Sequence, residues 1–413
     1  MAGAIGGGAV MGRARPAERS DLRTELCPAA ILVDQALARM DSRVDWLARL
    51  TPVNVTEIWD GFRASGFRHM PDSRFSEGLE NDAPVLRREL FALPVREIDN
   101  PLLEALMLEK QREIDQQIEL VRMRDKQGFI LASIDLFGHV SEQSLQEACE
   151  LLAEVPRSAP DRADADAVDV RTAALDEVAR YRARHPHFRC EVIVDPKPGT
   201  SLYVSQGNFH VAHDYRTQRS RIDPLIQHEI GTHVVTRHNG QRQPLHTLAG
   251  GLSGYDELQE GVAVLAEYLA GYLPAHRLRT LAARVVAAHM AVEERLGPEI
   301  YACLVDEHHI DGATAFDTAL RAKRGGGLTK DALYLKGLAE LLAYLRRDGD
   351  LEVLFLGKFA LKHLHILETL VDDGVLHPPE ILPSFIESPS ARERLAEART
   401  VPLNRFYQES TPS

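Results

Sequence analysis

Apolar residues recur at intervals of three and four positions along most of the chain, and this spacing predicts a series of amphipathic helices. The most regular helix is expected from Asn100-Pro101 to about Arg124, because Asn100 can cap the first free amides and Pro101 suits the first helical position. Charged residues opposite its apolar stripe are predicted to form a solvated face. They are Glu109, Lys110, Arg112 and Glu113.

Further helices are predicted where the same spacing lies between turn-forming residues. They comprise residues 20–50, 54–62, 141–155, 170–185, 276–296, 351–373 and 389–399. Strand patterns are short: residues 190–194 alternate in polarity, and 202–205 and 209–212 flank Gln206-Gly207-Asn208, which predicts a hairpin. The expected fold class is α+β, predominantly α-helical. An edge of the small sheet can pair with an extended peptide, or the sheet can be purely structural.

The predicted domain organisation follows changes in composition. Residues 156–169 are rich in Pro, Ala and Asp and poor in large apolar residues, which indicates a linker or surface loop. They separate an N-terminal helical region, 21–155, from a second region, 170–400, which contains the candidate chemistry. Residues 1–20 are expected to be a disordered tail, and 401–413 a second tail.

Composition narrows the functional classes. The 413 residues carry a net charge of −13 with a pI near 5.7, which argues against binding to nucleic acids or anionic membranes. There is no run of 18 apolar residues, so no membrane span is expected, and the Ala/Gly-rich start lacks the basic region of a secretory signal. The cysteines have no CxxC spacing, which favours buried free thiols in a reducing, cytoplasmic compartment. They are Cys27, Cys149, Cys190 and Cys303.

The candidate metal-binding residues are concentrated in residues 223–240, which are expected to form one helix. Asp223 is predicted to cap it, with Pro224 in its first turn, and Asn239-Gly240 is predicted to end it. Within it lies His-Glu-x-x-x-His, residues 228–233, a pattern with two potential metal ligands and a carboxylate beside the first.

The spacing of the two histidines is five residues, which has a structural consequence. On a regular α-helix, side chains five positions apart diverge by about 140° and cannot share one metal ion. A π-type turn brings them together, and Gly231 and Thr232 lie where a small residue and a back-bonding hydroxyl ease that distortion. We therefore predict a zinc-binding helix with a π turn through His228 and His233. The alternative is a structural pair of helix histidines.

A third ligand is expected from the helix that follows the glycine-rich turn at residues 250–254. Catalytic zinc sites use three protein ligands, and two His with one Glu is a known set. Glu260 is the preferred candidate, with Glu257 and Glu267 as rivals on roughly the same helix face. Gly261 is expected to keep the metal side of the helix uncrowded.

Two blocks of residues resemble a known family. The first comprises His228-Glu229-Ile230-Gly231-Thr232-His233, Arg237, Asn239, Gln243-Pro244, Gly251-Leu252, Gly254-Tyr255 and Gln259-Glu260-Gly261-Val262-Ala263. The second comprises Arg321, Arg324-Gly325-Gly326-Gly327, Lys330-Asp331 and Tyr334-Leu335-Lys336-Gly337. With these residues the chain resembles the QEGLA-motif proteins. Their bacterial members are labelled flavohaemoglobin-expression modulators, and their eukaryotic relatives are the microtubule-associated tyrosine carboxypeptidases.

The likeness runs from about residue 25 to 395, with Val262 in place of the Leu of the motif. It implies a zincin-like metallopeptidase fold with His228, His233 and Glu260 on Zn²⁺ and with Glu229 catalytic. It does not imply tubulin as the substrate.

The second block suggests where a substrate binds. Four cations surround three glycines in an otherwise acidic chain, and a glycine loop at a helix start offers amides to anions. For a carboxypeptidase that anion is the terminal carboxylate, so Arg324 and Lys330, and after them Arg321, are predicted to bind it. Thr329 is expected to cap the next helix, and Tyr334 to polarise a carbonyl oxygen. A flexible loop with solvated cations is the alternative.

The predicted function is zinc-dependent removal of a C-terminal residue from a peptide or protein, with Glu229 passing a proton from water to the leaving amine. A zinc-containing regulatory or scaffold protein is the alternative, and a fourth ligand from His238 or His246 would favour it. An endopeptidase would instead have a cleft open at both ends. His308-His309 is interpreted as a pair of surface residues.

Overall fold

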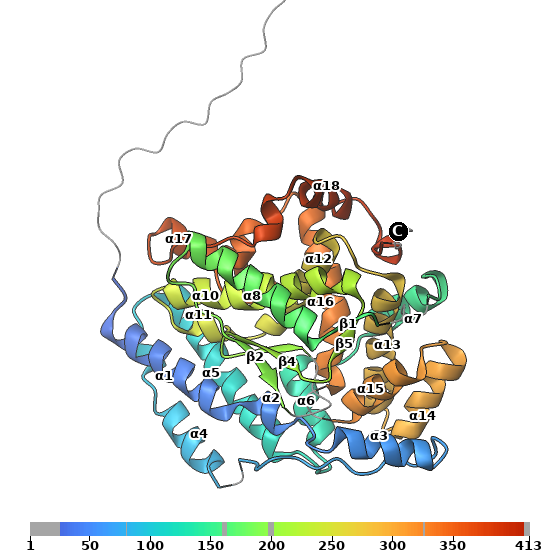
Figure 1. Cartoon of the computed structure of the whole chain (residues 1–413). Helices are drawn as coiled ribbons and strands as arrows, with labels where there is room; N and C mark the ends of the chain where they lie inside the picture. The colour runs from blue at the N-terminus through green and yellow to red at the C-terminus, as the bar shows by residue number, and fades with distance from the viewer. Residues whose placement is uncertain (1–24, 80, 159–162, 197–201, 325–326, 409–413) are drawn as a thin grey trace, which may run out of the picture.

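The computed structural model describes residues 25–79, 81–158, 163–196, 202–324 and 327–408 (Figure 1). The N-terminal helices are α1 (Pro28–Val44), α2 (Trp46–Arg49), α3 (Val55–Ala64), α4 (Ala83–Phe91), α5 (Pro101–Arg122), α6 (Phe129–Phe137) and α7 (Glu142–Glu154). The central helices are α8 (Ala167–Arg184), α9 (Ile222–Ile226), the π-helix η3 (Gln227–Val234), α10 (Val235–Arg242), α11 (Thr247–Gly250) and α12 (Tyr255–Leu269).

The C-terminal helices are α13 (Ala275–Val292), α14 (Gly297–Ala302), the π-helix η4 (Cys303–Glu307), α15 (Gly312–Lys323), α16 (Leu333–Arg346), α17 (Leu364–Asp372) and α18 (Pro389–Ala398). Short 3₁₀ segments are η1 (Val95–Glu97), η2 (Arg219–Arg221), η5 (Leu328–Ala332), η6 (Glu352–Phe355), η7 (Leu361–His363), η8 (Ser384–Glu387) and η9 (Leu403–Arg405). Together with two small sheets, these elements confirm the predicted, predominantly helical α+β class.

The larger sheet contains β2 (Val192–Asp195), β3 (Tyr203–Ser205) and β4 (Asn208–Ala212) in the order β2-β4-β3. The predicted hairpin is confirmed, because β3 and β4 pair antiparallel around a two-residue turn. Both turn residues, Gln206 and Gly207, have positive φ angles, as the tight turns of hairpins require. β2 pairs parallel with β4, and a second sheet pairs β1 (Ala165–Asp166) with β5 (Arg216–Thr217).

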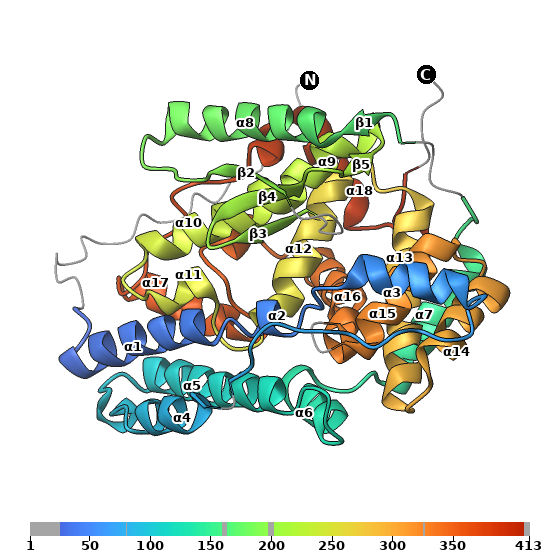
Figure 2. The same ribbon diagram turned by 60° about the horizontal axis from the view of Figure 1, so that its bottom comes forward.

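The sheet lies between two helical layers. Helix α8 covers one face, and η3 packs against β3 and β4 (Figure 2). Helix α12 in turn packs against both η3 and α16. The N-terminal helices α1, α4, α5 and α6 form the layer at the bottom of Figure 2. The segment richest in candidate chemistry is therefore enclosed by packed elements.

The N-terminal helices are joined to the rest of the protein by buried polar contacts. Asp34 in α1 accepts hydrogen bonds from the backbone amides of His246 and Thr247. Glu113 in α5 accepts one from the amide of Gly254 at 2.7 Å and pairs with Lys110 at 2.7 Å. The prediction that Lys110 and Glu113 are solvated is wrong, because this side of α5 faces the rest of the protein and both side chains are buried.

Packed structure extends across and beyond the predicted domain boundaries. The predicted linker, 156–169, contains β1 and the start of α8, whose first turn is capped by Asp166. At the other end Phe406 is fully buried and stacks on Tyr268, so the packed chain continues past residue 400 to Gln408, whose amide bonds to Leu273. The predicted tail at 1–20 and the end of the one at 401–413 lie outside the described residues.

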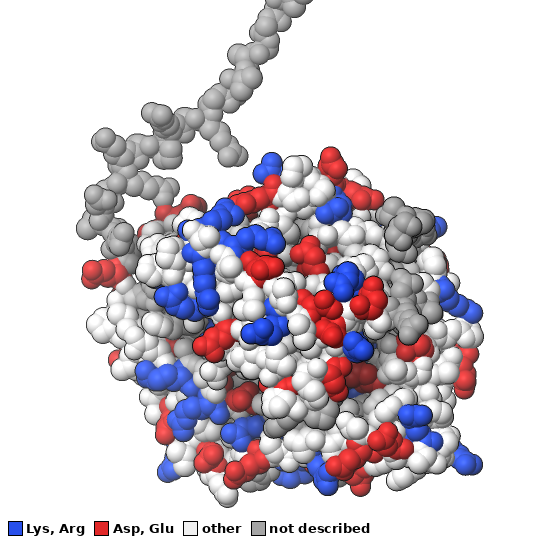
Figure 3. Space-filling model, viewed as in Figure 1, with Lys and Arg blue, Asp and Glu red and all other residues white. Residues whose placement is uncertain are grey.

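Two surface properties bear on function. None of the helices that the structure describes has the length and apolar character needed to cross a membrane. On the face drawn in Figure 3, acidic and basic side chains are interspersed. The surplus of negative charge therefore does not form a single field on that face.

Candidate metal centre

The histidines predicted as ligands lie on a continuous helical segment formed by α9, η3 and α10. Asp223 is inside the first turn rather than at the cap, because η2 leads directly into α9 and begins the helix earlier. The predicted stop at Asn239-Gly240 is also wrong, since α10 continues to Arg242. Gly240 is needed for packing instead: a Cβ atom there would lie 2.3 Å from the carbonyl oxygen of Leu248.

The π turn predicted from the histidine spacing is confirmed. Residues Gln227–Val234 form π-helix, and the hydroxyl of Thr232 donates to the carbonyl oxygen of Gln227, five residues earlier, at 3.0 Å. Both imidazoles therefore lie on one side of the helix, with ring centroids 5.2 Å apart. The wide turn removes the divergence that a regular α-helix would impose on these residues.

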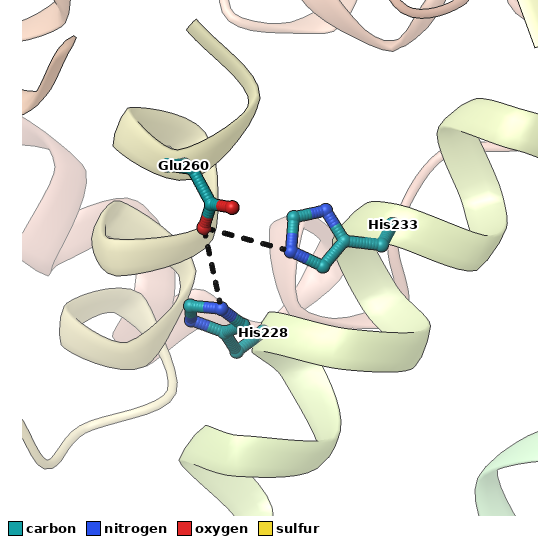
Figure 4. Close-up of side chains that lie close together, drawn as sticks. All are labelled: His228, His233 and Glu260. Carbon is teal, nitrogen blue, oxygen red and sulfur yellow. Dashed lines mark ion pairs between the residues drawn. The ribbon is translucent and has the colours of Figure 1, made fainter. Parts of the chain in front are cut away.

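Glu260 reaches the same point from α12 (Figure 4). Its Oε2 atom lies 3.9 Å from Nε2 of His228 and 3.9 Å from Nε2 of His233. The three side chains are largely buried. Two neighbouring helices thus bring three donor atoms to one point.

The two rival glutamates have other partners. Glu257 pairs with Lys336 at 2.7 Å. Glu267 is fully buried, and its Oε1 lies 2.9 Å from Nδ1 of His228, on the side of the ring opposite the Nε2 atom that faces Glu260. Arg221 and Arg277 also pair with Glu267, at 2.7 and 3.1 Å. This carboxylate therefore orients a candidate ligand.

Gln259 orients the second histidine, a contact that the sequence analysis did not anticipate. Its side chain is hydrogen bonded to His233, and its Oε1 accepts a bond from the hydroxyl of Thr236. The adjacent residue, Gly261, does not face the metal side as predicted. A Cβ atom there would lie 2.6 Å from the backbone of Gly337, so this glycine permits the close approach of α12 and α16.

Glu229 is buried beside this cluster. Burial raises the pKa of its carboxyl to about 7; the neighbouring His228 opposes that rise and Glu260 adds to it. In contrast, burial lowers the pKa of His233 to about 3, so that imidazole is neutral at physiological pH. A neutral imidazole has a free lone pair, which metal binding requires.

The donor set fits a zinc ion. The donor atoms of His228, His233 and Glu260 all lie within 4.8 Å of one another. Tetrahedral zinc with bonds of about 2.0–2.2 Å requires ligand atoms about 3.3–3.6 Å apart, so only small movements are needed. Within the described residues this group contains three protein donors and neither His238 nor His246. Three donors leave one position open for water or substrate.

Comparison with known proteins identifies the family. A family model described as microtubule-associated tyrosine carboxypeptidase matches residues 60–401. The chain belongs to this family. Over 180 residues it is 28% identical to microtubule-associated tyrosine carboxypeptidase 1 of Rattus norvegicus and 29% identical to that of Mus musculus. Each match covers 40% of this chain and 36% of the relative, so the aligned part spans about a third of the length of those proteins.

In this family member, two of the three cations predicted to bind substrate are engaged within the protein. Arg321 forms a two-pronged pair with Asp331, at 2.6 and 2.8 Å. Lys330 is buried, 3.1 Å from Asp256 and 3.8 Å from Glu260. Thr329 is not a helix cap: it lies within η5, and its hydroxyl bonds to Ser133.

Arg324 and Arg284 differ from those two cations. Their Nε atoms are buried and have no hydrogen-bond partner in the described structure. Burial, together with the nearby charge of Arg321, lowers the pKa of Arg324 to about 10 and also lowers that of Arg284. The sequence analysis missed Arg284, because a single arginine on an amphipathic helix gives no signal of its own.

Tyr334 lies between Arg284 and Lys330, and Lys330 is close to Glu260 of the candidate metal centre. The guanidinium carbon of Arg284 lies 4.9 Å from the centre of its ring, and Nζ of Lys330 lies 5.6 Å from it. Burial, followed by the charge of Glu260, raises the pKa of its hydroxyl, so the phenol keeps its proton. The result is a basic cluster of Arg284, Arg321, Arg324 and Lys330, in which Lys330 lies beside Glu260.

Proposed function

We propose that this chain is a zinc-dependent carboxypeptidase that removes the C-terminal residue of a peptide or protein. The observation that carries the proposal is the meeting of Nε2 of His228 and Nε2 of His233 around Oε2 of Glu260. The description of the family, which names a carboxypeptidase, supports the same reaction. The metal helix beside a small sheet is also consistent with a zincin-like fold.

The proposed chemistry is hydrolysis of an amide bond. Zinc held by two imidazoles and one carboxylate supplies a Lewis acid that polarises a carbonyl group and lowers the pKa of water to about 7. Glu229, adjacent to His228 and buried, accepts a proton from the attacking water and delivers it to the leaving amine. Glu267 and Gln259 hold the two imidazoles in position throughout.

The basic cluster limits cleavage to the end of a chain. Arg284 and Arg324 are proposed to bind the terminal carboxylate of the substrate, because each has a buried N–H group without a partner among the described residues. Arg321 and Lys330 are proposed to act less directly, since their pairs with Asp331 and Asp256 fix the cluster. Tyr334 lies between the two sets and is proposed to donate a hydrogen bond to a substrate carbonyl oxygen.

The sheet provides a way to align an extended substrate. Strand β3 is at the edge of the sheet and packs against η3. A peptide that adds to this edge would run beside the metal helix with its backbone groups paired. The partner proposed is thus the C-terminus of a peptide or protein. The four free cysteines are consistent with a reducing, cytoplasmic environment.

A metal count and a peptide library test the proposal together. The purified chain should retain zinc, and mass spectrometry should show a much faster loss of single residues from peptides with free C-termini than from amidated ones. Glu260→Ala should lose both zinc and turnover. Cleavage at internal bonds would point to an endopeptidase, and retained zinc without any cleavage would favour a regulatory protein.

A further inference from the structure

A second π-helical turn, η4, brings together another set of potential metal ligands. A sulfur atom of Cys303, a carboxylate oxygen of Glu307 and a ring nitrogen of His308 all lie within 4.8 Å of one another. Cys303 and His308 are five positions apart, the same separation as the histidines of η3. In both places the widened turn places side chains on one face that a regular α-helix would separate.

The core holds this turn in shape. The amide of His308 donates to the carbonyl oxygen of Cys303 at 3.2 Å. Arg279, a buried residue of α13, donates to the carbonyl oxygens of His308, Leu152 and Val155. A single guanidinium thus ties the end of η4 to the end of α7, so the three donors do not depend on a loop that must first become ordered.

The surroundings of the cluster leave it accessible. Cys303 and His308 are half-buried and Glu307 is exposed, so an ion can enter from solvent. Burial raises the pKa of the Cys303 thiol, and the charges of Glu307 and Cys149 raise it further. The prediction of buried cysteines holds only for Cys190, because Cys149 is exposed and Cys27 and Cys303 are half-buried.

We propose that Cys303, Glu307 and His308 bind a second Zn²⁺ ion, separate from the site on η3. Thiolate, imidazole and carboxylate together suit a borderline-soft ion such as zinc and disfavour Mg²⁺ and Ca²⁺, which take oxygen ligands. The bound ion would hold η4 in its folded conformation. It should therefore raise the melting temperature of the protein. The proposal does not depend on hydrolytic activity.

Cobalt distinguishes the two sites, because only the second contains sulfur. The full chain, purified with a non-thiol reductant and loaded with Co²⁺, should bind about two ions and show a thiolate-to-cobalt charge-transfer absorption. Cys303→Ser and His308→Gln should each lose one ion and that absorption. His233→Gln should lose one ion and keep the charge-transfer absorption. Cys27→Ser, outside the cluster, is the matched control.

Zinc should also raise the melting temperature of His233→Gln but not of a variant that combines His233→Gln with Cys303→Ser. A wild-type chain without the thiolate-to-cobalt absorption, or an absorption that survives Cys303→Ser and disappears in Cys149→Ser, would overturn the assignment.

Discussion

Nδ1 of His228 lies 2.9 Å from Oε1 of Glu267, about two helical turns beyond Glu260 on α12. The same helix therefore supplies both a candidate ligand and the carboxylate that orients another ligand. Arg221 and Arg277 pair with Glu267, and these pairs outweigh the effect of burial and hold the pKa of Glu267 well below its usual range. This carboxylate is charged and fixed before any metal binds.

Glu267→Gln should weaken zinc binding by about 10- to 100-fold, because the imidazole of His228 loses its charged partner. It should also destabilise the fold by about 3–5 kcal/mol, since two buried arginines lose their counter-charge. Competition with a zinc chelator and urea unfolding measure the two effects. The control is Glu257→Gln, also on α12, whose carboxylate pairs with Lys336 of α16. Equal zinc affinity in both variants would contradict the orienting role.

Glu229→Gln should keep zinc and lose turnover. The amide preserves the size of the side chain but cannot accept the proton from water, so kcat should fall by about 100- to 10,000-fold. Zinc content by mass spectrometry and peptide release at saturating substrate check the two halves of this expectation. Retained hydrolysis would remove Glu229 from its proposed role, and loss of zinc would show that it supports the metal instead.

Arg284→Gln should lower kcat/KM for peptides with a free C-terminus by about 10- to 100-fold, because a charge-assisted hydrogen bond to the terminal carboxylate is lost. The residual cleavage of C-terminally amidated peptides should not change. Lys336→Gln, which alters a cation on α16 that pairs with Glu257 and Glu340, is the control. A uniform loss on both kinds of peptide would mean that Arg284 supports the structure around Tyr334 rather than the substrate.

The histidine spacing predicted the local structure of the site because geometry left one solution. Two ligands five positions apart require a π turn, and both the turn and the back-bonding hydroxyl of Thr232 are present. The helix end at Gly240 could not be predicted in the same way. Because Gly240 has no Cβ atom, the backbone of Leu248 can pack closely against it. That tertiary contact outweighs the local preference of Asn-Gly to stop a helix.

Side chains of the surrounding network were harder to predict, because their roles depend on tertiary neighbours. The i,i+3 pair of Lys110 and Glu113 has the pattern of a solvated helix face, yet α1 and the amide of Gly254 bury it. Arg321 has the pattern of a substrate-binding cation, but Asp331 occupies its fork. A sequence indicates which groups carry charge; the packing decides which of them remain available.

The pair of Arg321 and Asp331 gives the stability a pH dependence. Burial raises the pKa of Asp331, but Arg321 and Arg284 outweigh it and bring the pKa to about 2. Because the pKa in the folded state is below that of the unfolded state, about 4, this stabilisation is complete above pH 4 and is lost as the pH falls towards 2. Between pH 5 and 2 the free energy of unfolding should drop by about 2 kcal/mol more in the wild type than in Asp331→Asn. If urea unfolding shows the same fall in the free energy of unfolding between pH 5 and 2 for both proteins, the pairing is contradicted.

Gly261→Ala should disturb the metal centre through the packing of α12 rather than through any contact with the ion. The new methyl group would lie 2.6 Å from the backbone of Gly337, which cannot move aside as a flexible side chain can. Separation of the two helices should cost about 1–3 kcal/mol of stability, and it displaces the adjacent Glu260 from the histidines, so zinc affinity should fall as well. Gly128→Ala is the control, because its methyl group meets only the flexible side chain of Met123 at a position with negative φ. If Gly261→Ala loses stability but binds zinc with unchanged affinity, Glu260 is held in place by its pairing with Lys330 rather than by the approach of α16.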